Sequence, residues 1–187
     1  MRVLIASVLS LGVLLVGCQT AQVRDPASPY FAPPVGSRLV LEKEIKVPGG
    51  KAAVYIQSGR VLRYTELDRY DPHCKFELRT VSPDRRMVAP DSFLVRDVER
   101  FSQSVKWQRD EPVRVAARGG LLVGRDSEGG PFAEIMTTRL VLHSERQPEV
   151  FRMECSHWDE FEFPDHLSVN QMRATLKGLF TLELAGG

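Results

Sequence analysis

Apolar and polar residues alternate with a period of two from Arg38 onward, which is the pattern of a β-strand with one buried face. The alternation runs first over residues 38–47 and resumes over residues 51–57. Pro48-Gly49-Gly50 separates the two stretches, and Pro followed by Gly suits the central positions of a type II turn. The pattern therefore predicts a β-hairpin over residues 38–57.

Similar alternation predicts separate short strands along most of the remaining chain. Residues 125–131 are polar and rich in Gly, which predicts a loop. The apolar residues that mark these strands are Cys74, Phe76 and Leu78; Phe93 and Val95; Val105 and Trp107; Val113 and Val115; Leu140 and Leu142; Phe151, Met153 and Cys155; and Phe180, Leu182 and Leu184.

One stretch near the C-terminus has the features of a helix instead. Ser168 is a good N-cap, and Gln171 three residues later completes a capping box. Met172 and Leu176 belong to one apolar stripe, and Gly178 is a natural C-terminal stop. We expect a short helix whose stability depends on packing this stripe against the sheet.

Length and composition agree with one folded domain. The chain has 187 residues, of which 43% are hydrophobic and 26% charged, values typical of a globular protein with a real core. We predict a mainly β fold for residues 38–187, namely an antiparallel β-sandwich or small barrel with one short α-helix in its C-terminal region.

The N-terminus has the pattern of an export signal. Met1-Arg2 is positive, and the run from Val3 to Val16 is apolar or small. At about 14 residues this run is shorter than the roughly 20 that a membrane-spanning helix needs, so it suits the middle region of a secretory signal peptide. The run ends in Leu15-Val16-Gly17-Cys18.

These four residues closely resemble the lipobox of bacterial lipoproteins. The resemblance implies that residues 1–17 are a signal peptide, cleaved after Gly17, and that the Cys18 sulfur carries a diacylglyceryl group. It further implies a lipid bilayer as partner and the bacterial cell envelope as location. Gln19 stands where an inner-membrane retention signal has Asp, which favours the outer membrane in a Gram-negative host. The alternative is an ordinary signal peptide with an incidental cysteine.

Residues 18–37 separate the predicted anchor from the predicted domain. Pro26, Pro29, Pro33 and Pro34 lie in this segment, which has no hydrophobic periodicity and therefore favours extended conformations. We expect a solvated, Pro-rich tether; the alternative is that Tyr30-Phe31 docks on the domain.

The charge balance does not favour a polyanionic partner. The whole chain has 25 basic and 24 acidic side chains, and removal of residues 1–17, which include Arg2 but no acidic residue, leaves equal numbers. A net charge of zero gives no reason to expect binding to nucleic acid.

Two cysteines remain once Cys18 is acylated. The alternation places Cys74 and Cys155 on the apolar faces of their strands, and an exported protein meets oxidising conditions. We predict a buried Cys74–Cys155 disulfide that closes a loop of about 80 residues. The alternative is a pair of buried thiols.

Motifs for catalysis or metal binding are weak. His73-Cys74 and Cys155-x-His157 lack the usual spacing of zinc ligands, and disulfide-bonded cysteines cannot bind as thiolates. The acidic, aromatic run at residues 158–165 lacks the spacing of a calcium loop. The chain has neither a Gly-x-Ser-x-Gly elbow nor a phosphate loop. We therefore predict no cofactor, no metal and no catalytic residue.

The polar residues nearest the predicted disulfide form the first-ranked binding surface: Tyr70, Asp71, His73, His157 and Trp158. The leading hypothesis is a non-enzymatic envelope lipoprotein that binds a protein partner or supports an envelope assembly. One alternative is a carrier that holds a small apolar ligand inside a β-barrel. The other is an envelope hydrolase that uses His157 or the acidic run.

Overall fold

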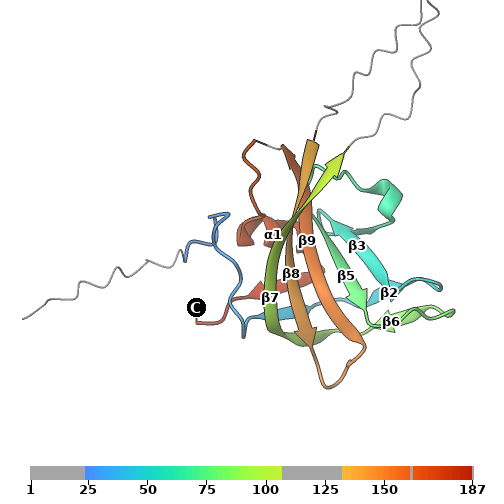
Figure 1. Ribbon diagram of the computed structural model, residues 1–187. Coiled ribbons are helices and arrows are strands. Elements are labelled where there is room, and N and C mark those ends of the chain that lie inside the picture. Colours follow the sequence, from blue (N-terminus) through green and yellow to red (C-terminus); the bar gives the residue numbers. More distant parts are fainter. Residues whose placement is uncertain (1–23, 107–131, 161, 187) are drawn as a thin grey trace, which may run out of the picture.

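The computed structural model describes residues 24–106, 132–160 and 162–186 (Figure 1). Over these residues the fold is mainly β with a single helix, as the alternation predicted. The strands are β1 (Arg38–Leu41), β2 (Ile45–Val47), β3 (Ala53–Gln57), β4 (Arg60–Leu62), β5 (His73–Leu78), β6 (Arg86–Val88), β7 (Asp91–Lys106), β8 (Phe132–His143), β9 (Val150–Glu160) and β10 (Phe180–Glu183); the 3₁₀ turn η1 spans Tyr64–Glu66 and the helix α1 spans Val169–Leu176.

Within the described residues, eight strands form one antiparallel sheet in the order β10-β1-β7-β8-β9-β5-β3-β4. The sheet curls into a half-barrel that stays open between β10 and β4, while β2 and β6 pair separately beside it (Figure 1). Helix α1 packs on β10, β5 and β3, so it covers the face of the sheet that carries the core. No described helix is long and apolar enough to cross a bilayer.

The core lies on one face of this sheet, which we call the inner face. Phe76 of β5 is fully buried at its centre, with its ring 6.1 Å from that of Phe93 and 5.2 Å from that of Phe180. Alternate residues of the strands reach this face because successive side chains of a strand point to opposite sides. Met172 and Leu176 of α1 are buried against it.

The hairpin predicted for residues 38–57 is wrong. A turn does form, but one residue later than predicted: the Lys51 N–H donates to the Pro48 carbonyl at 3.2 Å, so the central residues are Gly49 and Gly50, the latter with φ +74°. However, β1 pairs with β7 and β10, β2 pairs with β6, and β3 pairs with β4 and β5. Alternation identifies the buried face of a strand but contains no information about its partner.

Strand β7 is longer than the pattern suggested. Phe93 and Val105, predicted in separate strands, belong to the same one. The pairing of β7 with β8 shifts between Val95 and Asp97, and an irregularity of this kind changes which residues face which side. Phe93 therefore points into the core, whereas Phe101 lines a hollow on the opposite side. The predictions for Trp107, Val113, Val115 and residues 125–131 fall outside the described residues.

The helix begins and ends as predicted. The Ser168 hydroxyl accepts a hydrogen bond from the Gln171 N–H at 3.3 Å, and the Gln171 side-chain oxygen accepts one from the Ser168 N–H at 2.9 Å. Gly178 follows the C-cap with φ +81°, a conformation that glycine adopts without strain. The capping box thus marks the N-terminal end of α1.

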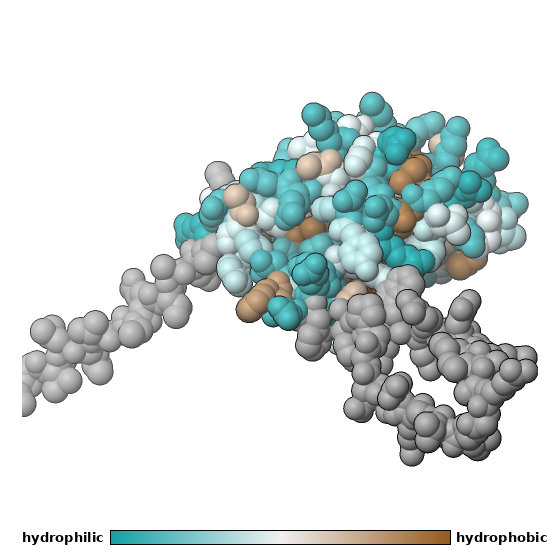
Figure 2. Space-filling view, turned by 90° about the horizontal axis from the view of Figure 1, so that it is seen from above, coloured by the Kyte–Doolittle hydropathy of each residue, from teal (hydrophilic) through white to brown (hydrophobic). Residues whose placement is uncertain are grey.

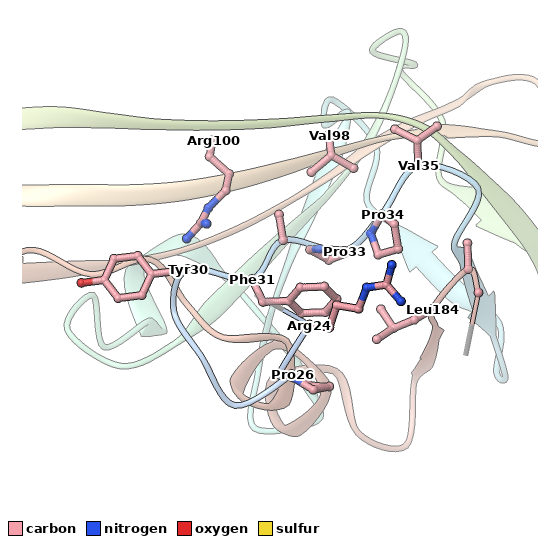
Figure 3. A pocket seen from close by; sticks show the side chains of 13 residues that line it. Arg24, Pro26, Tyr30, Phe31, Pro33, Pro34, Val35, Val98, Arg100 and Leu184 are labelled. Carbon is pink, nitrogen blue, oxygen red and sulfur yellow. The ribbon is translucent and has the colours of Figure 1, made fainter. Parts of the chain in front are cut away.

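Residues 24–37 lie against the domain, where the sequence led us to expect a solvated tether. The Asn170 N–H donates to the Pro26 carbonyl at 3.0 Å, and the Gly36 N–H donates to the Val95 carbonyl at 2.9 Å. Phe31 packs on the core while Tyr30 points the other way (Figure 3). A groove of about 950 Å³ separates this segment from the domain. The boundaries predicted at residues 17 and 37 stay predictions.

Candidate binding face

The side of the sheet turned away from the core, which we call the outer face, is polar and aromatic. Where β3, β5, β9, β8 and β7 run side by side, it has a hollow of about 290 Å³. The alternation that buries Cys74 and Phe76 on the inner face places Lys75 on the outer face. The alternation of the strands therefore decides which side chains line the hollow.

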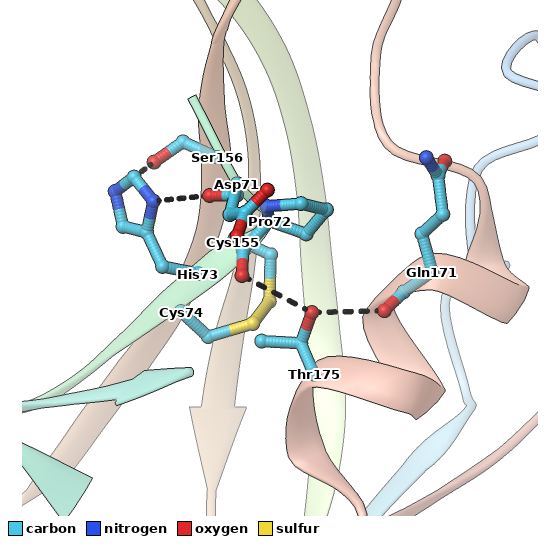
Figure 4. Close-up of a disulfide and its surroundings, with 8 residues drawn as sticks. All are labelled: Asp71, Pro72, His73, Cys74, Cys155, Ser156, Gln171 and Thr175. Atoms are coloured by element: carbon cyan, nitrogen blue, oxygen red, sulfur yellow. Dashed lines mark hydrogen bonds between the residues drawn. A yellow bond between two sulfur atoms is a disulfide. The ribbon is translucent and has the colours of Figure 1, made fainter. Parts of the chain in front are cut away.

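A disulfide lies directly beneath this hollow. Cys74 and Cys155 are bonded, with the sulfur atoms 2.04 Å apart, and both side chains are buried on the inner face (Figure 4). The predicted bridge is thus confirmed. It joins β5 to β9 at paired positions, so the strands that carry the outer-face residues His73 and Ser156 are held in register.

His73 connects a backbone carbonyl to a serine hydroxyl. Its Nδ1 lies 3.0 Å from the Asp71 carbonyl oxygen and its Nε2 lies 3.3 Å from the Ser156 hydroxyl (Figure 4). Burial lowers the pKa of His73, and the nearby charges of His157 and Arg69 act in the same direction. The neutral ring satisfies both contacts if Nδ1–H donates to the Asp71 carbonyl and Nε2 accepts from Ser156.

Three aromatic side chains and one arginine form what we call the Arg69 cluster: Tyr64, Arg69, Tyr70 and Trp158. The Arg69 guanidinium carbon lies 5.1 Å from the centre of the Trp158 ring and 5.2 Å from that of Tyr64. Tyr70 meets Trp158 edge-on, with the ring centres 5.9 Å apart. The Trp158 N–H donates to the Arg69 carbonyl at 2.8 Å, which fixes the loop that carries Arg69 to β9.

The remaining cations of the hollow are neutralised by carboxylates. Arg139 contacts Glu154 at 2.7 Å and Glu99 at 2.6 Å, and Arg152 contacts Glu77 at 2.6 Å. Burial alone would raise the pKa of Glu77, but its hydrogen bonds to Arg152 and Lys75 lower it overall. In contrast, no described carboxylate lies within ion-pair distance of Arg69.

The structure brings together four of the five residues predicted for the binding surface. His73 and Trp158 line the hollow, Tyr70 contacts Trp158, and the Asp71 carbonyl contacts His73. His157 is the exception, because the side chain next to Trp158 on a strand faces the other side of the sheet. Its Nε2 lies 3.5 Å from Asp159, away from the hollow.

Arg69 and Tyr64 were missed by the sequence analysis. They lie between β4 and β5, in a stretch of the chain without hydrophobic alternation. The only local signal was the density of aromatic and Arg residues between Arg63 and Tyr70, and the contact with Trp158 spans almost 90 positions of the sequence.

A second polar cluster lies on the inner face, where β7, β8 and β9 extend past the core. Thr138 and Glu134 of β8 are buried there. Arg100 of β7 is paired with Thr138, and His157 of β9 is paired with Met136 of β8. Buried atoms of these residues and of His166 have no hydrogen-bond partner among the described residues. Burial lowers the pKa of His166 to about 4, and the proximity of Arg100 and His157 contributes.

The hydrolase and metal hypotheses can be compared with this geometry. The described residues place no Ser, Thr or Cys within hydrogen-bonding distance of His157. In the acidic run, Asp159 accepts hydrogen bonds from the N–H groups of Glu160 and Asp165, so it closes a loop. Over residues 24–106, 132–160 and 162–186, no three His, Cys, Asp or Glu side chains are grouped for metal binding.

The exposed surface suits contacts by individual side chains. Seen from the side of Figure 2, hydrophobic residues are scattered among hydrophilic ones and do not merge into one broad patch. Tyr64 and Tyr70 are 50% and 58% exposed, whereas Trp158 is 9% exposed. The two tyrosines therefore present rings to solvent, while Trp158 forms the floor beneath Arg69.

Comparisons with protein families, with curated proteins and with solved structures gave no family, protein or structure that matches this chain.

Proposed function

We propose that this protein is a lipid-anchored binding module of the bacterial envelope, and that the outer face recognises a protein partner without catalysis. The observation that carries the proposal is Arg69, held against Tyr64 and Trp158 beside the exposed ring of Tyr70. Trp, Tyr and Arg are the residues that most often dominate the energy of protein interfaces.

The anchor is inferred from the sequence. Leu15-Val16-Gly17-Cys18 supports acylation of Cys18, and two or more acyl chains give durable membrane attachment. Arg24, which lines the groove beside the domain, is six positions after Cys18, and six positions span at most about 20 Å. The domain would thus lie close to the bilayer, with a partner in the membrane or just above it.

The carrier alternative is less well supported. A carrier needs an enclosed apolar cavity, but the inner face is filled by the side chains of Phe76, Phe93 and Phe180 and by α1. The groove beside residues 24–37 is only partly enclosed and is lined in part by Arg24 and Arg100.

A second candidate function is acyl transfer by Ser156. The contacts from the Asp71 carbonyl through His73 to Ser156 resemble the relay of a serine hydrolase, in which the base is oriented by a third group. However, Ser156 lies in β9, which pairs with β5 on one side and with β8 on the other. The backbone N–H groups around it are therefore occupied by sheet hydrogen bonds. An oxyanion would have to be stabilised by side chains such as Arg69.

A fluorophosphonate probe separates the two candidates. The binding proposal predicts no labelling of the purified protein, whereas a hydrolase would be labelled at Ser156 and would lose the label in Ser156→Ala. Labelling that disappears in both Ser156→Ala and His73→Gln would replace the binding proposal with the hydrolase.

Metabolic labelling tests the anchor. Cells that express the full chain should incorporate labelled palmitate into it, and Cys18→Ser should abolish both the label and cleavage after Gly17. Processing and membrane attachment that persist unchanged in Cys18→Ser would contradict the anchor.

Site-specific photo-crosslinking tests the binding face. We replace Tyr70 by p-benzoylphenylalanine, which keeps an aromatic ring at an exposed position of the Arg69 cluster. The matched control carries it at Val81, which is 64% exposed in the connection between β5 and β6. Irradiated cells should give a discrete protein adduct from position 70 and not from position 81. No adduct from position 70, or the same adducts from both, would contradict the proposal.

A further inference from the structure

We infer that the partner inserts an acidic side chain, Asp or Glu, into the hollow of the outer face, where the Arg69 guanidinium receives its carboxylate. This inference rests on the proposed function and specifies the chemistry of the partner.

The charges of the hollow leave room for one more carboxylate. Lys75, Arg139 and Arg152 share the hollow with Arg69, and each contacts Glu77, Glu99 or Glu154 within 4.0 Å. Arg69 has only ring contacts with Tyr64 and Trp158 and no described carboxylate beside it. Among the described cations that line the hollow, Arg69 is therefore the one without a carboxylate beside it.

The stacked Arg69 guanidinium is well placed to bind a carboxylate. The ring faces of Tyr64 and Trp158 attract the cation but use none of its five N–H donors. Those donors match the two oxygens of a carboxylate, and the rings limit the rotamers that Arg69 adopts. The loop itself is fixed by the Trp158 N–H, which donates to the Arg69 carbonyl. Arg69 is thus pre-positioned, which lowers the entropy lost on binding.

The size of the hollow suits a single side chain. At about 290 Å³ the hollow is at the lower limit of small-molecule sites, which range from about 300 to 1,000 Å³. It accommodates one side chain of a partner, and Gln103, Thr137 and Ser156 on its walls offer further hydrogen-bonding groups. Tyr64 and Tyr70 at its edge are exposed and available to pack against the residues on either side of the inserted one.

The charge pairing also disfavours a polyanion. Glu77, Glu99 and Glu154 already pair with the other cations of the hollow, whereas successive phosphates of a nucleic acid need several free cations. A single carboxylate needs only Arg69. The pattern therefore favours an acidic side chain in an otherwise neutral protein segment.

The experiment uses the photo-crosslinker at position 70 in the full-length, membrane-attached chain. The adduct yield is compared among otherwise unchanged Arg69, Arg69→Gln, Arg69→Lys and Arg63→Gln. Arg63 is the matched control, because it precedes Arg69 by six residues, is 80% exposed and pairs with Glu66 at 2.7 Å. We expect at least a tenfold lower yield for Arg69→Gln, an intermediate yield for Arg69→Lys, which keeps the charge but loses the fork, and no change for Arg63→Gln.

Mass spectrometry of the adduct then identifies the crosslinked segment. We expect an Asp or Glu of the partner within a few residues of the crosslink. Its replacement by Asn or Gln should lower the adduct yield as much as Arg69→Gln does. Combining the two replacements should lower the yield no further. An adduct insensitive to Arg69→Gln, or joined to a segment without an acidic residue, to a glycan or to nucleic acid, would overturn this inference while leaving a binding face at position 70. Complete absence of an adduct would instead contradict the proposed function. Thermal unfolding of each variant shows whether a lost adduct reflects a lost fold.

Discussion

Gly59 combines an unusual backbone conformation with a close contact to the C-terminal end of α1. It follows Ser58 in the two-residue turn between β3 and β4, and both residues have positive φ, 51° for Ser58 and 73° for Gly59. A turn of this kind matches the twist of a β-hairpin. The Gly59 N–H also donates to the Thr175 carbonyl at 2.8 Å, so the turn is joined to the end of α1.

Gly59→Ala should destabilise the fold more than Gly50→Ala. Both glycines have a positive φ near 73°, at which a Cβ costs about 1–2 kcal/mol. At Gly59 the added Cβ would also lie 2.4 Å from the Lys177 carbonyl oxygen, whereas at Gly50 nothing lies within 4 Å. Urea unfolding should therefore give a clearly lower free energy of unfolding for Gly59→Ala. Equal losses in the two variants would show that the contact with Lys177 is unimportant.

His166 should make stability depend on pH. Its pKa is lowered from 6.5 to about 4 in the folded state, mainly by burial. The unfolded chain thus binds a proton between these values that the folded chain does not, and the free energy of unfolding falls as the pH falls from 6.5 towards 4. His73, whose pKa is also lowered by burial, acts in the same direction.

The test is the urea midpoint between pH 7 and pH 4.5 in the unchanged chain and in His166→Gln. The variant should lose less stability over this interval, because Gln does not titrate. Parallel pH profiles for the two proteins would argue against burial of His166 in the folded state.

At the element scale, the disulfide is a covalent link that holds β5 and β9 together. Cys74 and Cys155 are 81 positions apart in the sequence but directly paired in the sheet. The loop that the bond closes contains β6, β7 and β8, so the bond restricts a large part of the unfolded chain. It also lies under His73 and Ser156 and thereby supports the outer face.

Replacing both cysteines by alanine should lower the free energy of unfolding by about 4 kcal/mol, the chain-entropy estimate for a loop of this length. Urea unfolding followed by circular dichroism measures the change. Reductant should destabilise the unchanged chain to a similar extent and leave the double variant unaffected. A double variant as stable as the oxidised chain would mean that the sheet already restricts β5 and β9 without the bond.

At the scale of the whole molecule, the N-terminal segment would set how the domain is oriented relative to the bilayer if Cys18 carries the proposed anchor. Residues 24–37 are hydrogen-bonded to the β7 residue Val95 and to Asn170 of α1, so they move with the domain. In Figure 1 this segment lies on the opposite side of the domain from β6. With Cys18 acylated, the segment would be near the bilayer and β6 far from it.

Fluorescence quenching by a headgroup-labelled lipid checks this arrangement in vesicles that carry the acylated chain. A dye on Val35→Cys, a position 58% exposed in the unchanged chain, should be quenched more strongly than one on Met87→Cys in β6. Inserting about 30 Gly and Ser residues between Thr20 and Ala21 should reduce quenching at residue 35, because a flexible linker of that length spans tens of ångströms. Equal quenching at both positions before the insertion would contradict a fixed orientation.

Much of the candidate face followed from local pattern, and the rest did not. Tyr70, Asp71, His73 and Trp158 were identified because they flank the two cysteines, whose pairing could be expected from their number and faces. Arg69 was not, because its importance depends on lying beside Trp158 and on the absence of a described carboxylate nearby. His157 was grouped with Trp158 in the predicted binding surface, although strand alternation places the two side chains on opposite sides of the sheet.

By itself, the sequence determined which face of each strand is buried, as at Cys74 and Phe76, and that a helix begins after the N-cap Ser168. Both features arise from interactions among residues a few positions apart. Only the tertiary structure decided that β1 pairs with β7 and β10, and that Arg69 lies over Trp158. Strand pairing depends on the apolar area buried by the whole sheet and on the entropy of closing long loops, and neither quantity is encoded in any short stretch of the chain.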